Sequence, residues 1–214
     1  LDAYQATIDA ATDFDFDNKR PVHIHVDLSS IRPAGEKLKG FGGTSNPIKL
    51  RDLFYRVAEI LTAAVGRKLT AVECCLLIDE AATVVVAGNI RRSAGMRQFS
   101  FDNQQANKAK DNLWQQDAEG NWKIDPKRDA LRMANHTRVY HKKPSLEEVT
   151  EAVRKQFYSG EGAIQYAPEA IARSNSDLLN STRKKGRFIT IYENLGKESA
   201  AEYLWAINDA RGNP

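Results

Sequence analysis

Residues 145–166 read SLEEVTEAVRKQFYSGEGAIQY, which is a helix pattern followed directly by a strand pattern. Ser145 and Glu148 have capping-box spacing, in which each side chain accepts from the backbone N–H of the other, and they predict a helix to about Phe157. The glycine-rich segment 159–162 then ends the helix, and residues 163–166 form a predicted strand. This alternation of helix and strand indicates an α/β protein.

Two further helices are predicted upstream. Asn46 and Pro47 have the character of an N-cap and a first helical turn, and apolar residues then recur every three or four positions until Gly66. Thr70 and Glu73 repeat the capping-box spacing. The helix that follows them is apolar enough that we expect burial on several sides.

Other segments are expected to form strands or surface connections. Residues 22–28 alternate apolar and polar side chains, which predicts a strand with one buried face. Residues 102–131 are polar and turn-like, so we expect a surface excursion, after which residues 133–140 return to the core. The basic run 182–187 is predicted to be a solvated loop, because it has no interleaved aromatic residues that could stack on bases.

The composition excludes several classes of protein. The chain has 214 residues, of which 42% are hydrophobic and 28% charged, with a formal net charge of +3. It contains no run approaching the roughly eighteen apolar residues of a transmembrane helix and no signal-peptide pattern at its N-terminus. A cytoplasmic location is therefore expected. The weakly basic charge suits nucleotide phosphates and does not require a nucleic acid.

The cysteines and histidines do not indicate a metal site. Cys74 and Cys75 are adjacent in an apolar run, which argues against a disulfide framework or a zinc site and predicts buried thiols on a helix. His23, His25 and Asp27 share one face of the predicted strand, yet no further ligand is evident. We therefore expect no metal.

Several longer motifs occur in a characteristic order. These are Ile31–Gly35, Gly40–Gly43, Val72–Ala81, Gly88–Ala94, Asn135–Val139 and Tyr158–Gln165. In this order the chain resembles the adenosylcobalamin-dependent (class II) ribonucleotide reductases, particularly their cyanobacterial type. The resemblance extends over nearly the whole chain.

The resemblance implies a fold, a reaction and a set of partners. The fold is part of a ten-stranded α/β barrel, with this chain supplying much of the first half and not a complete barrel. The reaction is the radical conversion of ribonucleoside triphosphates to deoxyribonucleotides, with adenosylcobalamin as the cofactor of the complete enzyme. The expected partners are a ribonucleotide substrate, a deoxynucleoside triphosphate effector, the remaining segments of the reductase and a thioredoxin-type reductant, and no nucleic acid or membrane.

The end of the sequence carries the expected catalytic residue. Asn213 matches the family's motif asparagine, whose amide bonds the substrate ribose, and in the family Asn-Pro leads into Cys-Gly-Glu with the radical cysteine. Neither Cys74 nor Cys75 matches a redox position, so the chain alone is expected to be inactive. Interruption by an intein, gene fragmentation and an arbitrary boundary are three explanations of an end at Pro214.

The segment 31–43 resembles the family's first specificity loop, which holds the effector phosphates. The expected effector-binding residues are Arg32, Lys37, Lys39, Gly40, Gly42 and Gly43. Arginine can fork onto a phosphate, lysine adds positive charge, and glycines let backbone amides approach an anion. Such a loop is, by composition alone, more often an ordinary turn.

The segment 132–139 resembles the second specificity loop, which lies between effector base and substrate base and would couple the two sites allosterically. The expected residues are Arg132, Asn135, His136 and Arg138, with Arg138 reaching across to the substrate. For His136 a surface-loop role is an equal alternative. Arg91, Arg92 and Ser93 either contact nucleotide or pair with barrel carboxylates.

Two other functional classes stay open beside the enzyme. A binding module could use the same loops to hold a deoxynucleotide without chemistry, and a basic RNA-associated protein is a third, less favoured hypothesis. Because part of a barrel leaves strand edges and apolar faces exposed, we also expect the isolated chain to aggregate or to pack loosely.

Overall fold

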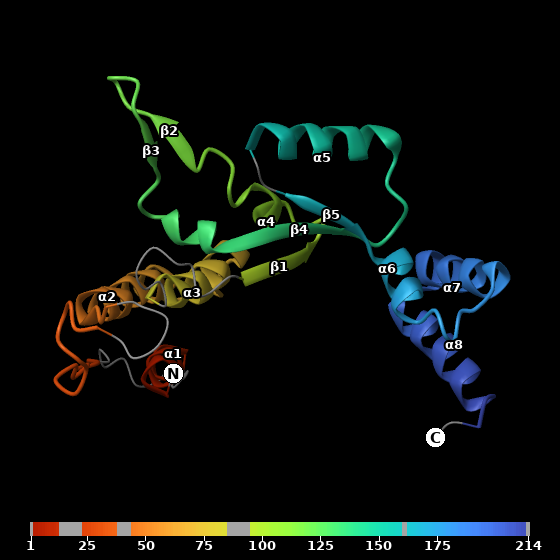
Figure 1. The fold of residues 1–214 in the computed structure, drawn as a ribbon, viewed down its shortest axis with the longest axis horizontal. Helices are drawn as coiled ribbons and strands as arrows, with labels where there is room; N and C mark the ends of the chain where they lie inside the picture. Colours follow the sequence, from red (N-terminus) through yellow and green to blue (C-terminus); the bar gives the residue numbers. More distant parts are fainter. Residues whose placement is uncertain (1, 13–22, 38–43, 85–94, 160–161, 213–214) are drawn as a thin grey trace. The chain divides into compact units, whose positions relative to one another are not determined.

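The computed structural model describes residues 2–12, 23–37, 44–84, 95–159 and 162–212 (Figure 1). They form two compact units. Unit 1 comprises the chain up to Gly95 together with Lys108–Ala134, and unit 2 comprises Met96–Asn107 together with Asn135 onward. Helices and a sheet with parallel strands confirm a mixed α/β fold. The described residues form no closed barrel, so membership of a ten-stranded barrel stays a prediction.

Unit 1 contains the helices α1 (Asp2–Thr12), α2 (Pro47–Ala63) and α3 (Ala71–Val84). The N-cap of α2 is Asn46, whose side chain accepts from the Lys49 N–H at 3.1 Å, as predicted. At the start of α3 the Glu73 N–H donates to Thr70 Oγ1 at 3.2 Å and the Thr70 N–H donates to Glu73 Oε2 at 2.8 Å. Both capped helices are confirmed.

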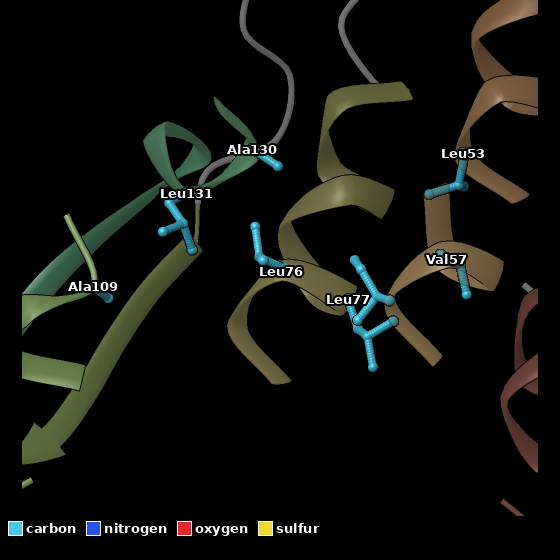
Figure 2. Close-up of a cluster of buried hydrophobic side chains, with 8 residues drawn as sticks. Leu53, Val57, Leu76, Leu77, Ala109, Ala130 and Leu131 are labelled. Atoms are coloured by element: carbon cyan, nitrogen blue, oxygen red, sulfur yellow. The ribbon is translucent and has the colours of Figure 1, made fainter. Parts of the chain in front are cut away.

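The core of unit 1 lies between α2, α3 and a 3₁₀ helix, η1 (Asp129–Met133). Figure 2 shows Leu77 of α3 beside Val57 of α2, while Leu131 and Ala130 of η1 face α3 from its other side. Val57 and Leu131 are fully buried. Apolar side chains at helical spacing on α2 and α3 therefore form the face that holds this unit together.

Helix α3 is buried on several sides, as expected, but the expectation of buried thiols is wrong, because one stripe of the helix is exposed. Ile78 is 63% exposed, the Cys74 thiol is exposed and Cys75 is only partly buried. Among the described residues α3 packs against α2 and η1, which leaves one side of this apolar helix in solvent. Hydrophobicity measures the tendency of a helix to be buried, whereas burial itself depends on the neighbours that are available.

Residues 102–131, which were expected to form a surface excursion, contain regular structure. They include α4 (Gln104–Lys108) and an antiparallel hairpin of β2 (Trp114–Gln116) and β3 (Trp122–Ile124). The hairpin matches the expectation of a surface segment, because both tryptophans are more than half exposed. Ala109 and Leu131, by contrast, belong to the core.

The strand predicted at residues 22–28 is not found in its described part, His23–Leu28, which has no regular structure. Alternation identifies a face that could be buried, but a strand forms only when a neighbouring strand accepts its backbone hydrogen bonds. Further on, Lys37 and Thr44 form an isolated antiparallel bridge, and the Ser45 N–H donates to the Glu36 carbonyl at 2.8 Å.

Unit 2 contains most of a three-stranded sheet with the order β1 (Gly95–Ser100), β4 (Ala134–Tyr140) and β5 (Ala163–Tyr166) (Figure 1). Strands β4 and β5 are parallel, with Thr137 opposite Ala163. The connection between them contains α5 (Leu146–Ser159). In its capping box the Ser145 N–H donates to Glu148 Oε2 at 2.7 Å and the Glu148 N–H donates to Ser145 Oγ at 3.1 Å. The helix and strand predicted from residues 145–166 are confirmed.

Three helices complete unit 2: α6 (Ala167–Ser174), α7 (Thr182–Leu195) and α8 (Lys197–Asp209). The basic run 182–187 was predicted to be a loop, and this is wrong, because it forms the first turns of α7. Ser181 caps that helix by accepting from the Lys184 N–H at 3.3 Å. Lysine and arginine are good helix formers, and the buried Phe188 and Tyr192 behind them anchor the helix.

Among the described residues, no helix combines the length and the apolar character that crossing a membrane requires. The cytoplasmic location stays a prediction.

Glu73 should make the stability of unit 1 depend on pH. Both its carboxylate oxygens accept from Arg67, at 2.6 and 2.8 Å, and this contact lowers the pKa of Glu73 from 4.5 to about 2. A lowered pKa stabilises the fold above about pH 4.5, and this contribution is lost as the pH falls toward about 2. Glu73→Gln keeps the capping oxygen and removes the charge.

At neutral pH we expect Glu73→Gln to lower the free energy of unfolding by about 1 kcal/mol, a value reduced for the solvent exposure of Arg67. Denaturant unfolding at pH 7 and at pH 3 measures this, and the two proteins should differ less at the lower pH. The control is Glu151→Gln, which breaks an exposed ion pair with Arg154 and should cost about 0.3 kcal/mol. An equal loss at both pH values would exclude the ion pair as the cause.

Candidate functional site

A charged cleft of about 550 Å³ lies in unit 1 between α2, the C-terminal part of α3 and η1. Its size is in the range of small-molecule sites. Its lining combines cations, carboxylates and apolar side chains: Lys49, Asp52, Leu53, Arg56, Glu80, Thr83, Pro126, Asp129, Ala130, Arg132 and Met133. One residue expected from the sequence to bind nucleotide, Arg132, is among them.

Arg56 connects the elements that surround the cleft. Its guanidinium donates to Glu80 of α3 at 3.2 Å, to Glu59 on its own helix at 2.8 Å and to the backbone carbonyl of Lys127. An arginine with three acceptors is held in one geometry, since its planar fork is satisfied in fixed directions. Arg56 therefore holds α2, α3 and the segment before η1 in place around the cleft.

Glu80 is the most buried carboxylate of the cleft, with 14% of its side chain exposed. Burial raises the pKa of Glu80 above its ordinary value, the Arg56 contact opposes this, and the charges of Asp129 and Asp79 add to the increase. A carboxyl group with a raised pKa and an available oxygen is a suitable hydrogen-bond partner for a polar ligand.

The outer part of the cleft carries both signs of charge. Arg132 forms an ion pair with Asp129 at 2.6 Å and leaves 58% of its side chain exposed. On the opposite wall Lys49 and Asp52 come from the first two turns of α2. Lys49 is exposed and can reach an anion with little rearrangement, whereas the guanidinium of Arg132 is held by Asp129.

Four residues of the cleft were not predicted from the sequence: Lys49, Asp52, Arg56 and Glu80. A signal was present, because positions 49, 52 and 56 recur at helical spacing beside the apolar face of α2. Glu80 is likewise a charge within an apolar helix. Only the packing of α2 against α3 and η1 brings these residues together.

The segment 132–139 is not a loop. Arg132 lies in η1, and Asn135, His136 and Arg138 lie on strand β4, with Asn135 exposed and the other two buried. From Ala134 onward the segment therefore has the backbone geometry of a strand, and its resemblance to the second specificity loop stays a prediction. A role of these residues in nucleotide specificity stays a prediction.

His136 is not on a surface loop either. It is 5% exposed, and its ring meets Phe99 edge to face with the centroids 5.7 Å apart. This contact and the burial of the ring exclude the alternative of a surface-loop histidine.

Arg138 is tied into unit 2 by its own hydrogen bonds. Its Nε donates to Asn107 Oδ1 at 2.7 Å and its Nη1 donates to the Gly162 carbonyl at 3.3 Å. Asn107 in turn donates to the Phe101 carbonyl. These two bonds use two of the five N–H donors of the guanidinium.

The expected effector loop is described only in part. Arg32 is exposed, and its Nε lies 3.8 Å from Glu36 Oε1. At the base of the loop the backbones of Lys37 and Thr44 form an isolated antiparallel bridge. Lys39, Gly40, Gly42 and Gly43 lie outside the described residues, as do Arg91, Arg92, Ser93 and Asn213. Their roles stay predictions.

Metal ligands do not cluster in the described part of the chain. No group of three or more histidine, cysteine, aspartate or glutamate side chains there has the geometry to hold a metal ion.

Comparison with known proteins identifies similar sequences over part of the chain. The adenosylcobalamin-dependent ribonucleoside-triphosphate reductase of Lactobacillus helveticus is 41% identical over 96 residues, which are 43% of this chain and 13% of that protein. The enzymes of Lactobacillus leichmannii and Levilactobacillus brevis are 44% identical over 86 residues and 43% identical over 77 residues. These matches cover 40% and 36% of this chain, and 12% and 10% of the two relatives.

About two fifths of this chain is homologous to these reductases. The matched part is only about an eighth of the length of the reductases. No family model matches the chain, and no solved structure matches it. The similarity confirms the resemblance to adenosylcobalamin-dependent reductases, whereas the cyanobacterial type stays a prediction.

Proposed function

We propose that this chain is part of an adenosylcobalamin-dependent ribonucleoside-triphosphate reductase and provides nucleotide-binding residues to it. The observation that carries the proposal is the 41% identity over 96 residues with the reductase of Lactobacillus helveticus. The reaction would convert ribonucleoside triphosphates to deoxyribonucleotides. Supporting chemistry comes from unit 1, where cations and hydrogen-bond acceptors line a cleft of small-molecule size.

The proposal assigns nucleotide contacts to two segments. Arg32 and Lys37, with Lys39 and the glycines that follow, would hold the phosphates of a deoxynucleoside triphosphate effector. Arg132, Asn135, His136 and Arg138 would couple that effector to the choice of substrate. Asn213 would bond the substrate ribose. Each effector would favour the arrangement of these residues that suits one substrate base.

The cleft does not fit the cofactor. A corrin ring with its adenosyl group is larger than the 550 Å³ available, and the lining is too rich in paired charges for a large macrocycle. Adenosylcobalamin would supply radical initiation elsewhere in a complete reductase. We do not propose that the described residues of this chain take part in radical initiation.

The proposed activity is tested with the full-length protein that carries this sequence. Purified protein is incubated with each ribonucleoside triphosphate, adenosylcobalamin and a thioredoxin-type reductant, and deoxyribonucleotides are measured by chromatography. We expect product only when the cofactor is present, and a substrate preference that changes with the deoxynucleoside triphosphate added. A folded protein that binds deoxynucleotides and forms no product would instead be the non-catalytic binding module.

A further inference from the structure

The guanidinium of Arg138 is a buried charge in unit 2. Arg138 lies on β4 with 8% of its surface exposed. Among the described residues both of its hydrogen-bond partners are neutral, namely Asn107 Oδ1 at 2.7 Å from Nε and the Gly162 carbonyl at 3.3 Å from Nη1. A buried charge is costly unless an opposite charge or further hydrogen bonds compensate it. The residues that hold this guanidinium therefore do not neutralise it, and they leave some of its N–H donors unused.

The amide of Asn107 is oriented by a bond at each end. Its Nδ2 donates to the Phe101 carbonyl, so its Oδ1 is the atom that faces Arg138. An amide with the opposite orientation would place its N–H groups against those of the arginine. The Phe101 carbonyl therefore determines that Asn107 presents an acceptor to Arg138.

Two bonds in different directions fix the plane of the guanidinium. Because the group is rigid and planar, bonds at Nε and Nη1 also determine where the N–H groups of Nη2 point. A charged group that is already held in position loses little conformational freedom when a ligand binds. Asn107 thus contributes preorganisation of Arg138, although it does not lie on the same strand.

A second donor lies on the same face of β4. Tyr140 is two residues beyond Arg138, so both side chains leave the strand on the same side. Its ring is buried and stacks on Phe101 with the centroids 4.4 Å apart. Its hydroxyl is buried and has no hydrogen-bond partner among the described residues, which is uncommon for a buried polar group. Arg138 and Tyr140 together indicate that this face receives a group with anionic oxygens.

We propose that Asn107 is a positioning residue for Arg138, and that it holds the guanidinium in place for an anionic oxygen group of a ligand that also contacts the Tyr140 hydroxyl. That this ligand is a ribonucleotide rests on the proposed function, in which Arg138 serves the choice of substrate. Asn107 itself lies on α4, 31 positions before Arg138 and outside the segment 132–139.

Binding of each ribonucleoside triphosphate to the full-length protein, measured by titration calorimetry without adenosylcobalamin, tests this role. Asn107→Ala removes the acceptor for Nε, so we expect the Kd to rise about tenfold. The matched control is Asn103→Ala, which removes the N-cap of the same helix, where Asn103 Oδ1 accepts from the Ala106 N–H at 3.1 Å. The control should leave the Kd nearly unchanged. An equal rise in both variants would overturn the proposal, because only the stability of α4 would then matter.

Asn107→Asp separates a positioning role from a purely structural one. The aspartate keeps an acceptor opposite Nε and places a negative charge beside the guanidinium, which weakens its attraction for an anion. We expect the Kd to rise about tenfold here too. Hydrogen exchange of peptides from 96–107 and 134–140 shows whether β1 and β4 stay folded in each variant. An unchanged Kd in Asn107→Asp would overturn the proposal.

Tyr140→Phe tests the second donor. The substitution removes only a hydroxyl that has no partner among the described residues, so hydrogen exchange of β4 should not become faster. The Kd should nevertheless rise several-fold, because the ligand loses one hydrogen bond. An unchanged Kd would overturn the Tyr140 contact.

The reductase assay is run on the same preparations. Ribonucleotide binding that weakens in the Asn107 variants, without any deoxyribonucleotide product, would refute the proposed activity and support the positioning role. Product formation with unchanged ribonucleotide binding in these variants would support the activity and overturn the positioning role. Wild-type protein that binds no ribonucleotide and forms no product would overturn both.

Discussion

Replacing Phe188 with alanine is expected to lower the free energy of unfolding of unit 2 by about 4 kcal/mol. Phe188 lies on α7 with 1% of its surface exposed, and it packs with Tyr192 in the core formed by α6, α7 and α8. The ring centroids of the two residues are 6.2 Å apart. Truncation removes the buried ring and leaves a cavity that the three helices cannot fill without moving.

Denaturant unfolding followed by circular dichroism measures this effect. The matched control is Trp205→Ala on α8, because Trp205 is also aromatic but 66% exposed. The control should cost no more than about 1 kcal/mol, since little surface is removed from the interior. Equal losses in the two variants would contradict the helical core described for unit 2.

Replacing Gly162 with alanine should lower the free energy of unfolding of unit 2 by about 3 kcal/mol. Gly162 has a φ of +102°, where side chains are rarely tolerated, and an added Cβ would lie 2.2 Å from Arg138 Nη1. The guanidinium must then move, although it is buried and bonded to Asn107. The cost combines backbone strain with the loss of charged hydrogen bonds in a buried site.

A control separates the two causes. Gly196 has a similar φ of +95°, but an added Cβ there would meet only Glu198, at an ordinary 3.5 Å. Gly196→Ala should therefore cost about 1 kcal/mol, the backbone term alone. In an Arg138→Ala background, Gly162→Ala should fall to the same value. A cost of 3 kcal/mol that persists without Arg138 would show that the contact is irrelevant.

The Gly162 variant also bears on nucleotide binding. Arg138 was predicted from the sequence to reach the substrate, and its bonds to Asn107 and Gly162 place it within unit 2. If the arginine serves nucleotide specificity, displacing it should alter the dependence of substrate choice on effector at temperatures where the variant stays folded. The reductase assay with several effectors measures this dependence.

Local patterns in the sequence predicted the elements that depend on neighbouring residues. Asn46, the Thr70–Glu73 pair and the Ser145–Glu148 pair each identify a helix start, because a cap bonds backbone groups within three residues. The strand at 163–166 was predicted from a short apolar segment after glycines, and its parallel pairing with β4 was not. Family motifs added the resemblance to the reductases, which comparison confirmed over part of the chain.

Local patterns failed where the outcome depended on distant partners. His23–Leu28 alternates as a strand does, yet strand formation requires hydrogen bonds from another strand. The basic run 182–187 has the composition of a loop, but Phe188 and Tyr192 bury against α6 and α8 and hold it in a helix. Cys74 lies in an apolar run and is nevertheless exposed.

The candidate sites illustrate the same division. By itself the sequence determined which residue types are present, where the three capped helices α2, α3 and α5 begin and which family the motifs resemble, because these depend on short-range order along the chain. Only the tertiary structure brought Lys49, Glu80 and Arg132 into one cleft and paired Arg138 with Asn107, 31 positions away. Such contacts arise from packing between distant segments, and spacing along the chain does not record them.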